Sequence, residues 1–173
     1  MTQHLSPLPT AASLFDATRC HIGYSDEIAL GAIHRREFQR FAVAVGDFNP
    51  IYFDEDAARA SGHAGLVVPP MFLSAVMGWG AGPAEGALRE DGLAESDSFL
   101  IPVSGLRLMG GGQEIEWHSP LLEGVRVTLL RTLENVRLRD GRTGPMVLLI
   151  VRRRYVDAGG RLLASCRETF IGR

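Results

Sequence analysis

Residues 44–60 read AVGDFNPIYFDEDAARA and place an acid, an amide and a phenol within six positions, at Asp47, Asn49 and Tyr52. A carboxylate beside a proton donor in a tight turn is typical of acid–base catalysis. Tyr52 is a poor base near neutral pH, because a phenol titrates near about 10 whereas an imidazole titrates near about 6.5. An Asp in such a loop also commonly braces the turn, and a Tyr commonly packs beneath it. The loop is therefore either a catalytic loop or a structural turn of the same shape.

Two helices are expected to position this loop. The first begins at Arg35 and ends at Gly46, where a glycine is typical of the residue after a helix. The second follows Asp54, a good N-cap with acidic residues in the first turn, and ends at Gly62. The first helix is amphipathic, with one apolar face at helical spacing formed by Phe38, Phe41, Ala42 and Val45.

The middle of the chain predicts a buried helix. Pro69 and Pro70 precede MFLSAVMGWG, and a proline is favoured at the first helical position. The helix expected over residues 70–79 is apolar almost all round, so it belongs inside the protein.

In the second half of the chain, apolar and polar residues alternate with a period of two. This pattern predicts long antiparallel strands joined by turns such as DGRTG and AGG. Helices followed by a strand meander indicate an α+β fold, with a sheet wrapped around the buried helix. We expect a single domain over residues 1–173, in which residues 1–23 form a surface arm.

Composition excludes several classes of function. The net charge of −2 gives no general attraction for nucleic acid or for an anionic membrane. The cysteines Cys20 and Cys166 match no metal-ligand spacing, so no metal site is expected. The N-terminus does not read as a signal peptide, and no apolar run is long enough to span a bilayer. The chain is therefore expected to be cytoplasmic.

Three stretches carry a resemblance to a known family. VGDFNPIYFDEDAARASGHAGLVVPPMFL, GGQEIEWHSPLLEGVRV and GRTGPMVLLIVRRRYVDAGGRLLASCRETFI resemble the MaoC-like dehydratases and hydratases, in particular the MaoC N-terminal-domain or FAS1-like dehydratase subgroup. The resemblance covers roughly residues 33–171. It implies a dimeric hot-dog fold and chemistry on acyl thioesters carried by coenzyme A or acyl carrier protein, without a further cofactor.

Two positions depart from the pattern of active members of that family. Their loop carries an Asp and, five positions later, a His, whereas this chain has Asp47 and Tyr52. Their helix start supplies a backbone N–H to the thioester oxygen, but the matching residue here is Pro70, which has no N–H. The amides of Met71 or Phe72 are candidate replacements.

Other polar residues near these positions have weaker assignments. Asn49 and Pro50 match the part of the loop that shapes the turn, and His63 lies where it could reach a substrate. His118 resembles a position of the sheet edge. The run Arg152–Arg154 could meet coenzyme A phosphates, but consecutive strand residues face opposite ways, so a solvated edge strand is favoured.

The resemblance favours the substrate-binding subunit of a two-chain dehydratase or hydratase, paired with a second hot-dog chain. One alternative is a self-sufficient homodimer with Asp47 as base and Tyr52 or water as acid. Another is a non-catalytic acyl-thioester-binding protein, since one fold hosts many functions. Thioesterase action is disfavoured by the GDFNP loop. The acyl chain, its carrier and the direction of the reaction are left open.

Overall fold

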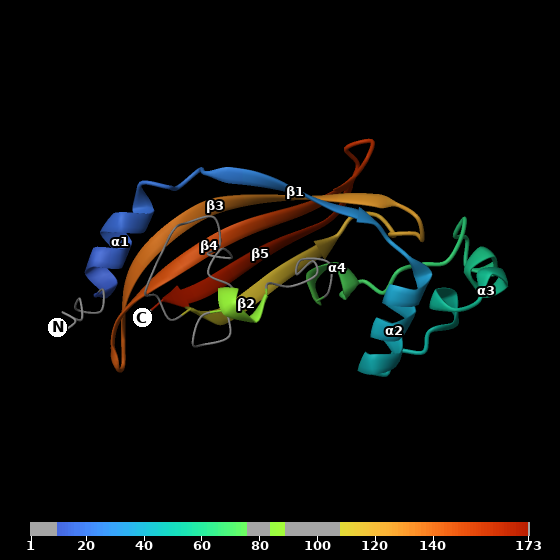
Figure 1. Ribbon diagram of the computed structural model, residues 1–173, viewed down its shortest axis with the longest axis horizontal. Helices are drawn as coiled ribbons and strands as arrows, with labels where there is room; N and C mark the ends of the chain where they lie inside the picture. Colours follow the sequence, from blue (N-terminus) through green and yellow to red (C-terminus); the bar gives the residue numbers. More distant parts are fainter. Residues whose placement is uncertain (1–9, 76–83, 89–107, 173) are drawn as a thin grey trace.

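The computed structural model describes residues 10–75, 84–88 and 108–172. Within these residues five strands form one curved antiparallel sheet in the order β1-β3-β4-β5-β2 (Figure 1). The strands are β1 Ser25–Ala32, β2 Leu108–Trp117, β3 Arg126–Gly141, β4 Gly144–Asp157 and β5 Leu162–Gly172. The helices are α1 Ala11–Arg19, α2 Arg35–Val45, η1 Pro50–Tyr52, α3 Glu55–Ala60, α4 Phe72–Ala75 and η3 Glu85–Ala87. The α+β prediction is confirmed.

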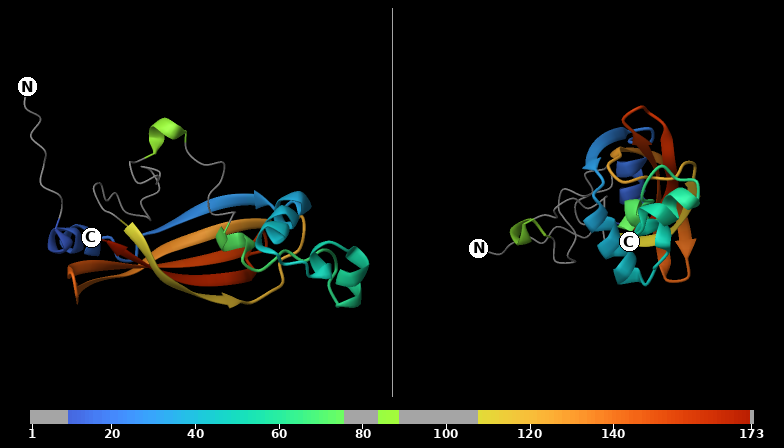
Figure 2. Two further views of the ribbon diagram at one scale, coloured as in Figure 1. Left: turned by 90° about the horizontal axis from the view of Figure 1, so that it is seen from below. Right: turned by 90° about the vertical axis from the view of Figure 1, so that its right-hand side faces the viewer.

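The core lies on the concave face of the sheet, against which α4 packs (Figure 2). The ring of Phe72 is fully buried and makes edge-to-face contacts with Phe38 and Phe41 of α2, at centroid distances of 6.4 and 5.8 Å. Contacts between these rings pack α4 against α2, and the shared core cluster packs both helices against the sheet. Of the predicted helix over residues 70–79, Phe72–Ala75 is helical, and residues 76–79 lie outside the described residues. The predicted start at Pro70 is wrong, because Pro70 and Met71 form a turn before the helix.

The two helices predicted around the loop are confirmed. α2 runs from Arg35 to Val45 and is followed by Gly46, whose φ of 74° is the left-handed conformation that favours glycine. The Asp54 carboxylate accepts hydrogen bonds from the amides of Asp56 and Ala57 at 2.8 and 3.2 Å, which caps α3. One detail is wrong: Val45, assigned to the buried face, is 59% exposed because α2 ends there, beyond the sheet.

Residues 1–23, expected as a surface arm, contain the helix α1. Leu14 of α1 is 3% exposed and packs against Leu133 and Leu149 of β3 and β4. The strand β1 was not predicted at all. It lies at one edge of the sheet and pairs with β3 alone among the described strands. Its residues are exposed or half-buried, so it lacks the fully buried apolar side chains that mark β4.

The prediction that Arg152–Arg154 lies on a solvated edge strand is wrong, because β4 is the central strand of the sheet. The expectation that the three side chains divide between two faces is confirmed. Arg152 and Arg154 are exposed, whereas Arg153 is only 13% exposed and its Nε lies 2.7 Å from the Glu168 carboxylate. At the other edge lies β2, which pairs with β5 alone among the described strands.

Candidate functional site

The loop between α2 and α3 is braced by its own polar side chains. The amide of Asn49 donates to Oδ1 of Asp47 at 3.2 Å, and the amide of Ile51 donates to Oδ1 of Asn49 at 3.3 Å. Pro50 then opens the turn of η1, with its φ already suited to a helix start. Asp47 and Asn49 therefore both have a structural task in this turn, and Asp47 remains half-buried.

Tyr52 is the least exposed polar side chain of the loop, with 6% of its surface accessible. Burial is the largest cause of a raised pKa for this phenol, and the negative charge of the neighbouring Asp47 raises the pKa further. The phenol is therefore protonated at neutral pH and can donate but not accept a proton. The side-chain amide of Gln39 donates to the carbonyl oxygen of Tyr52 at 3.0 Å, which ties the loop to α2.

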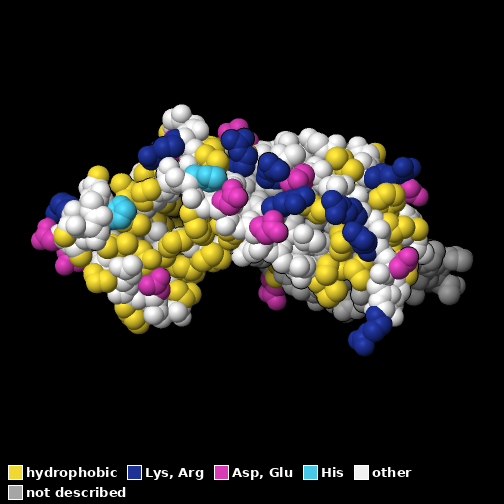
Figure 3. All heavy atoms as spheres, turned by 180° about the vertical axis from the view of Figure 1, so that it is seen from behind, with side chains coloured by type: hydrophobic (Ala, Val, Ile, Leu, Met, Phe, Trp, Pro, Cys, Tyr) yellow, Lys and Arg dark blue, Asp and Glu magenta, His cyan; other side chains and the backbone are white. Residues whose placement is uncertain are grey.

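A pocket of about 300 Å³ is lined in part by the segment that follows α3. Seen from behind, hydrophobic side chains gather around a hollow between the sheet and the end that carries α2 and α3 (Figure 3). The amide of Val67, in the pocket wall, donates to the carbonyl of Ile51 in the loop at 3.0 Å, so loop and pocket adjoin. The lining residues are Val67, Val68, Pro69, Pro70, Leu73, Trp117, His118, Ser119, Pro120, Leu121 and Leu163.

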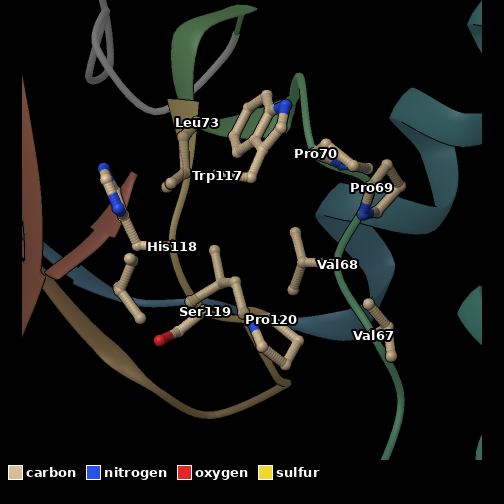
Figure 4. A pocket seen from close by; sticks show the side chains of 11 residues that line it. Val67, Val68, Pro69, Pro70, Leu73, Trp117, His118, Ser119 and Pro120 are labelled. Carbon is tan, nitrogen blue, oxygen red and sulfur yellow. The ribbon is translucent and has the colours of Figure 1, made fainter. Parts of the chain in front are cut away.

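The start of α4 forms part of the pocket. The rings of Pro69 and Pro70 lie along one side of it, and neither residue has a backbone N–H (Figure 4). The amide of Phe72 donates to the carbonyl of Pro69 at 3.0 Å, so this donor is already used. The amide of Met71 is the remaining candidate for a thioester oxygen at this position.

The predicted site residues fall into three groups. Pro70 lines the pocket, whereas Asp47, Asn49, Pro50 and Tyr52 lie in the adjoining loop and do not line it. The other predicted residues contribute no side chain to the described lining: His63 is half-buried after α3, Met71 is 41% exposed, and Phe72 belongs to the core.

Apart from Pro70, the lining residues were not assigned to a site from the sequence, and two of them carry large polar side chains. Trp117 ends β2 and places its indole beside the prolines. His118 follows it, but its imidazole turns away from the prolines (Figure 4) and lies 2.9 Å from the Ser165 hydroxyl on β5. The alternation of β2 ending in Trp117 was the available signal, but the pocket it faces is made by distant segments.

Two further findings bear on the kind of site. The described residues contain no group of three or more His, Cys, Asp or Glu side chains able to hold a metal ion. No helix within those residues has the length and apolar character needed to cross a membrane.

Comparison with known proteins places this fold. The chain matches the family "FAS1-like, dehydratase domain region" over residues 21–166. A UPF0336 protein of Parafrankia sp. is 30% identical over 141 residues, which cover 82% of this chain and 83% of the relative. The ChsH1-ChsH2 complex of Mycobacterium tuberculosis superimposes with a TM-score of 0.72 and 20% identity, covering 92% of this chain and 91% of that chain. The truncated HadBC (3R-hydroxyacyl-ACP dehydratase) complex of the same organism gives a TM-score of 0.66 at 20% identity, covering 87% and 96%.

The sheet, its strand order and these structural neighbours define a hot-dog fold. The chain belongs to the family of FAS1-like dehydratase domain regions, and it is related to the UPF0336 proteins.

Proposed function

We propose that this chain is the substrate-binding subunit of a two-chain dehydratase or hydratase of acyl thioesters. The observation that carries the proposal is the pairing of Asp47 with a buried, protonated Tyr52, where active members of the family have a histidine. The acyl part of the thioester would occupy the apolar pocket beside Trp117 and Pro70.

The chemistry explains why a partner is needed. Reversible hydration requires a base for the α-proton, an acid for the β-hydroxyl and a hydrogen-bond donor for the developing enolate oxygen. Asp47 is a candidate base, but Tyr52 does not cycle between acid and base near pH 7 when its pKa lies above the usual range. Pro70 lacks the donor that the thioester oxygen needs. Both missing functions would come from a second hot-dog chain.

Two facts support a paired assembly. The neighbours HadBC and ChsH1-ChsH2 are complexes of different chains. In this chain the strand β2 lies at the edge of the sheet and pairs on one side only, among the described strands. An open edge strand is a surface on which a second sheet can continue.

The test is a hydration assay with a short trans-2-enoyl-CoA. We expect the chain alone to bind the thioester without turnover, and turnover to appear when it is co-purified with a hot-dog chain that carries Asp, four residues and His. Turnover by the isolated chain that disappears in the Asp47→Asn variant would instead support the self-sufficient homodimer. Binding without turnover in either preparation would support the non-catalytic acyl-thioester-binding protein.

A further inference from the structure

We propose that the groove between the outer face of α2 and Phe53 binds a phosphorylated nucleoside, namely the 3′-phosphoadenosine diphosphate end of coenzyme A. The inference rests on the proposed function, because it names the carrier of the thioester. The groove has a volume of about 480 Å³. Its lining residues are Arg36, Gln39, Arg40, Val43, Ala44 and Phe53.

The arginines of α2 differ in their partners. Arg35 is committed to the fold, with Nε 2.6 Å from the Glu123 carboxylate and a terminal nitrogen 3.1 Å from Glu55. Arg36 and Arg40 are exposed, and neither forms an ion pair within the described part of the chain. Two like charges one turn apart on a helix repel each other. A bound anion between them would remove that repulsion.

The side chains that line the groove carry a net positive charge. Its lining contains two arginines and no acidic residue. A second arginine-rich pocket on the convex face of the sheet differs, because its lining includes Glu114 and Glu116. Two of its arginines, Arg152 and Arg167, also share the carboxylate of Glu134, at 3.1 and 3.0 Å. The groove on α2 is therefore the better anion site of the two.

The remaining residues of the lining are suited to contact with a nucleobase. Phe53 is 37% exposed and Val43 is 54% exposed, so an apolar surface stands open beside the two guanidinium groups. An aromatic ring offers a stacking face to a nucleobase, and an arginine fork matches phosphate oxygens. The volume is that of a small-molecule site, which favours a nucleotide over the acidic surface of a carrier protein.

The groove also adjoins the candidate catalytic loop. Gln39, in its floor, donates to the backbone carbonyl of Tyr52 at 3.0 Å, and Ala44 lies three positions before Asp47. A carrier anchored here would enter the site from the side of the loop, with its thioester arm directed past Tyr52.

The experiment measures binding of adenosine 3′,5′-bisphosphate by isothermal titration calorimetry. The expected result is that Arg36→Gln with Arg40→Gln weakens binding by about tenfold or more, since charge-assisted hydrogen bonds to both phosphates are lost. The control is Arg59→Gln. Arg59 is an exposed arginine of α3 that is paired with Glu55 and Asp56 and does not line the groove. Its affinity should stay within about twofold of the parent chain.

Equal affinity of the double variant and the control, with both folded by circular dichroism, would overturn the proposal. So would a double variant that loses affinity for an acidic acyl carrier protein but keeps its affinity for the nucleotide. The nucleotide has no acyl group and no thioester. Its binding therefore remains measurable even if the hydration assay shows that the proposed function is wrong.

Discussion

The loop at Asp47 and the pocket at Pro70 adjoin through a backbone hydrogen bond and shared core packing, but they differ in polarity. The loop is polar, braced by its own hydrogen bonds, and carries the candidate acid and base. The pocket is apolar, and its one histidine turns towards β5. The polar side chains of the candidate site thus lie in the loop, and its apolar surface lies in the pocket.

The largest effect is expected from a variant that restores the missing groups. The variant Tyr52→His with Pro70→Gly should hydrate a trans-2-enoyl-CoA about 10²- to 10⁴-fold faster than the uncatalysed background, the usual contribution of a positioned acid or base. The assay is initial-rate absorbance, and Tyr52→Phe with Pro70→Gly is the matched control. A folded variant that binds the thioester without any gain would place Tyr52 away from the reacting atoms.

The next effect concerns the core that holds loop and pocket together. Phe72→Ala should lower the free energy of unfolding by about 3–5 kcal/mol, because a fully buried ring and two aromatic contacts are lost. Urea denaturation measures it. Met71→Ala, at a side chain that is 41% exposed, should change stability by less than about 1 kcal/mol. Similar losses in both variants would show that α4 is not anchored through Phe72.

A smaller effect is expected on ligand affinity, and it tests the pocket independently of the loop. Trp117→Ala should weaken binding of an enoyl-CoA about tenfold, or about 1.4 kcal/mol, because the indole forms a pocket wall. Leu138→Ala is the control, since Leu138 is similarly exposed but lies at the far end of β3. Unchanged affinity in the Trp117 variant would exclude this pocket as the acyl site.

Within the loop, Asn49→Ala should cost about 1 kcal/mol of stability, because the Ile51 amide loses its acceptor. Asn49→Asp keeps an acceptor oxygen and should retain most of that stability. Thermal melts compare the two variants. If Asn49→Ala abolished thioester binding while leaving stability intact, Asn49 would be a ligand-contacting residue and not a brace.

The smallest effect is confined to alkaline pH. The raised pKa means that Tyr52 favours folding while it is protonated. That contribution is complete below about pH 10, the usual phenol pKa, and is lost as pH rises through the higher pKa of the folded state. The difference in ultraviolet absorbance between the parent chain and Tyr52→Phe reports ionisation of Tyr52, and its titration midpoint should lie above pH 10. The substitution Asp47→Asn should lower that midpoint, because the negative charge of Asp47 raises the pKa of Tyr52. A midpoint below 10 would contradict the burial of the phenol.

The sequence predicts the helices of this end of the molecule because their signals are local. Gly46 and Asp54 mark a helix end and a helix start through their own backbone and side-chain preferences. The position of β4 was misjudged because strand order depends on pairing between distant segments. A run of arginines looks the same on a central strand as on an edge strand. What differs is the partner Glu168, fifteen positions away from Arg153.

The two parts of the candidate site divide in the same way. The loop was found because Asp47, Asn49 and Tyr52 are close in sequence. The pocket was found only in part, because Val68 and Trp117 meet through folding of the whole chain. Trp117 is brought into place by the pairing of β2 with β5, where it lies opposite Ala164. No short motif contains that information.

The open strand β2 has a further consequence for how this protein meets other chains. Glu114 and Glu116 lie on the same face of the strand. Antiparallel pairing with an identical strand about Ile115 would set Glu114 of one copy against Glu116 of the other, and like charges directly opposite are destabilising. A strand with basic residues at those positions would be attracted instead. In this register, the charges on β2 would therefore disfavour pairing between two identical copies of the strand.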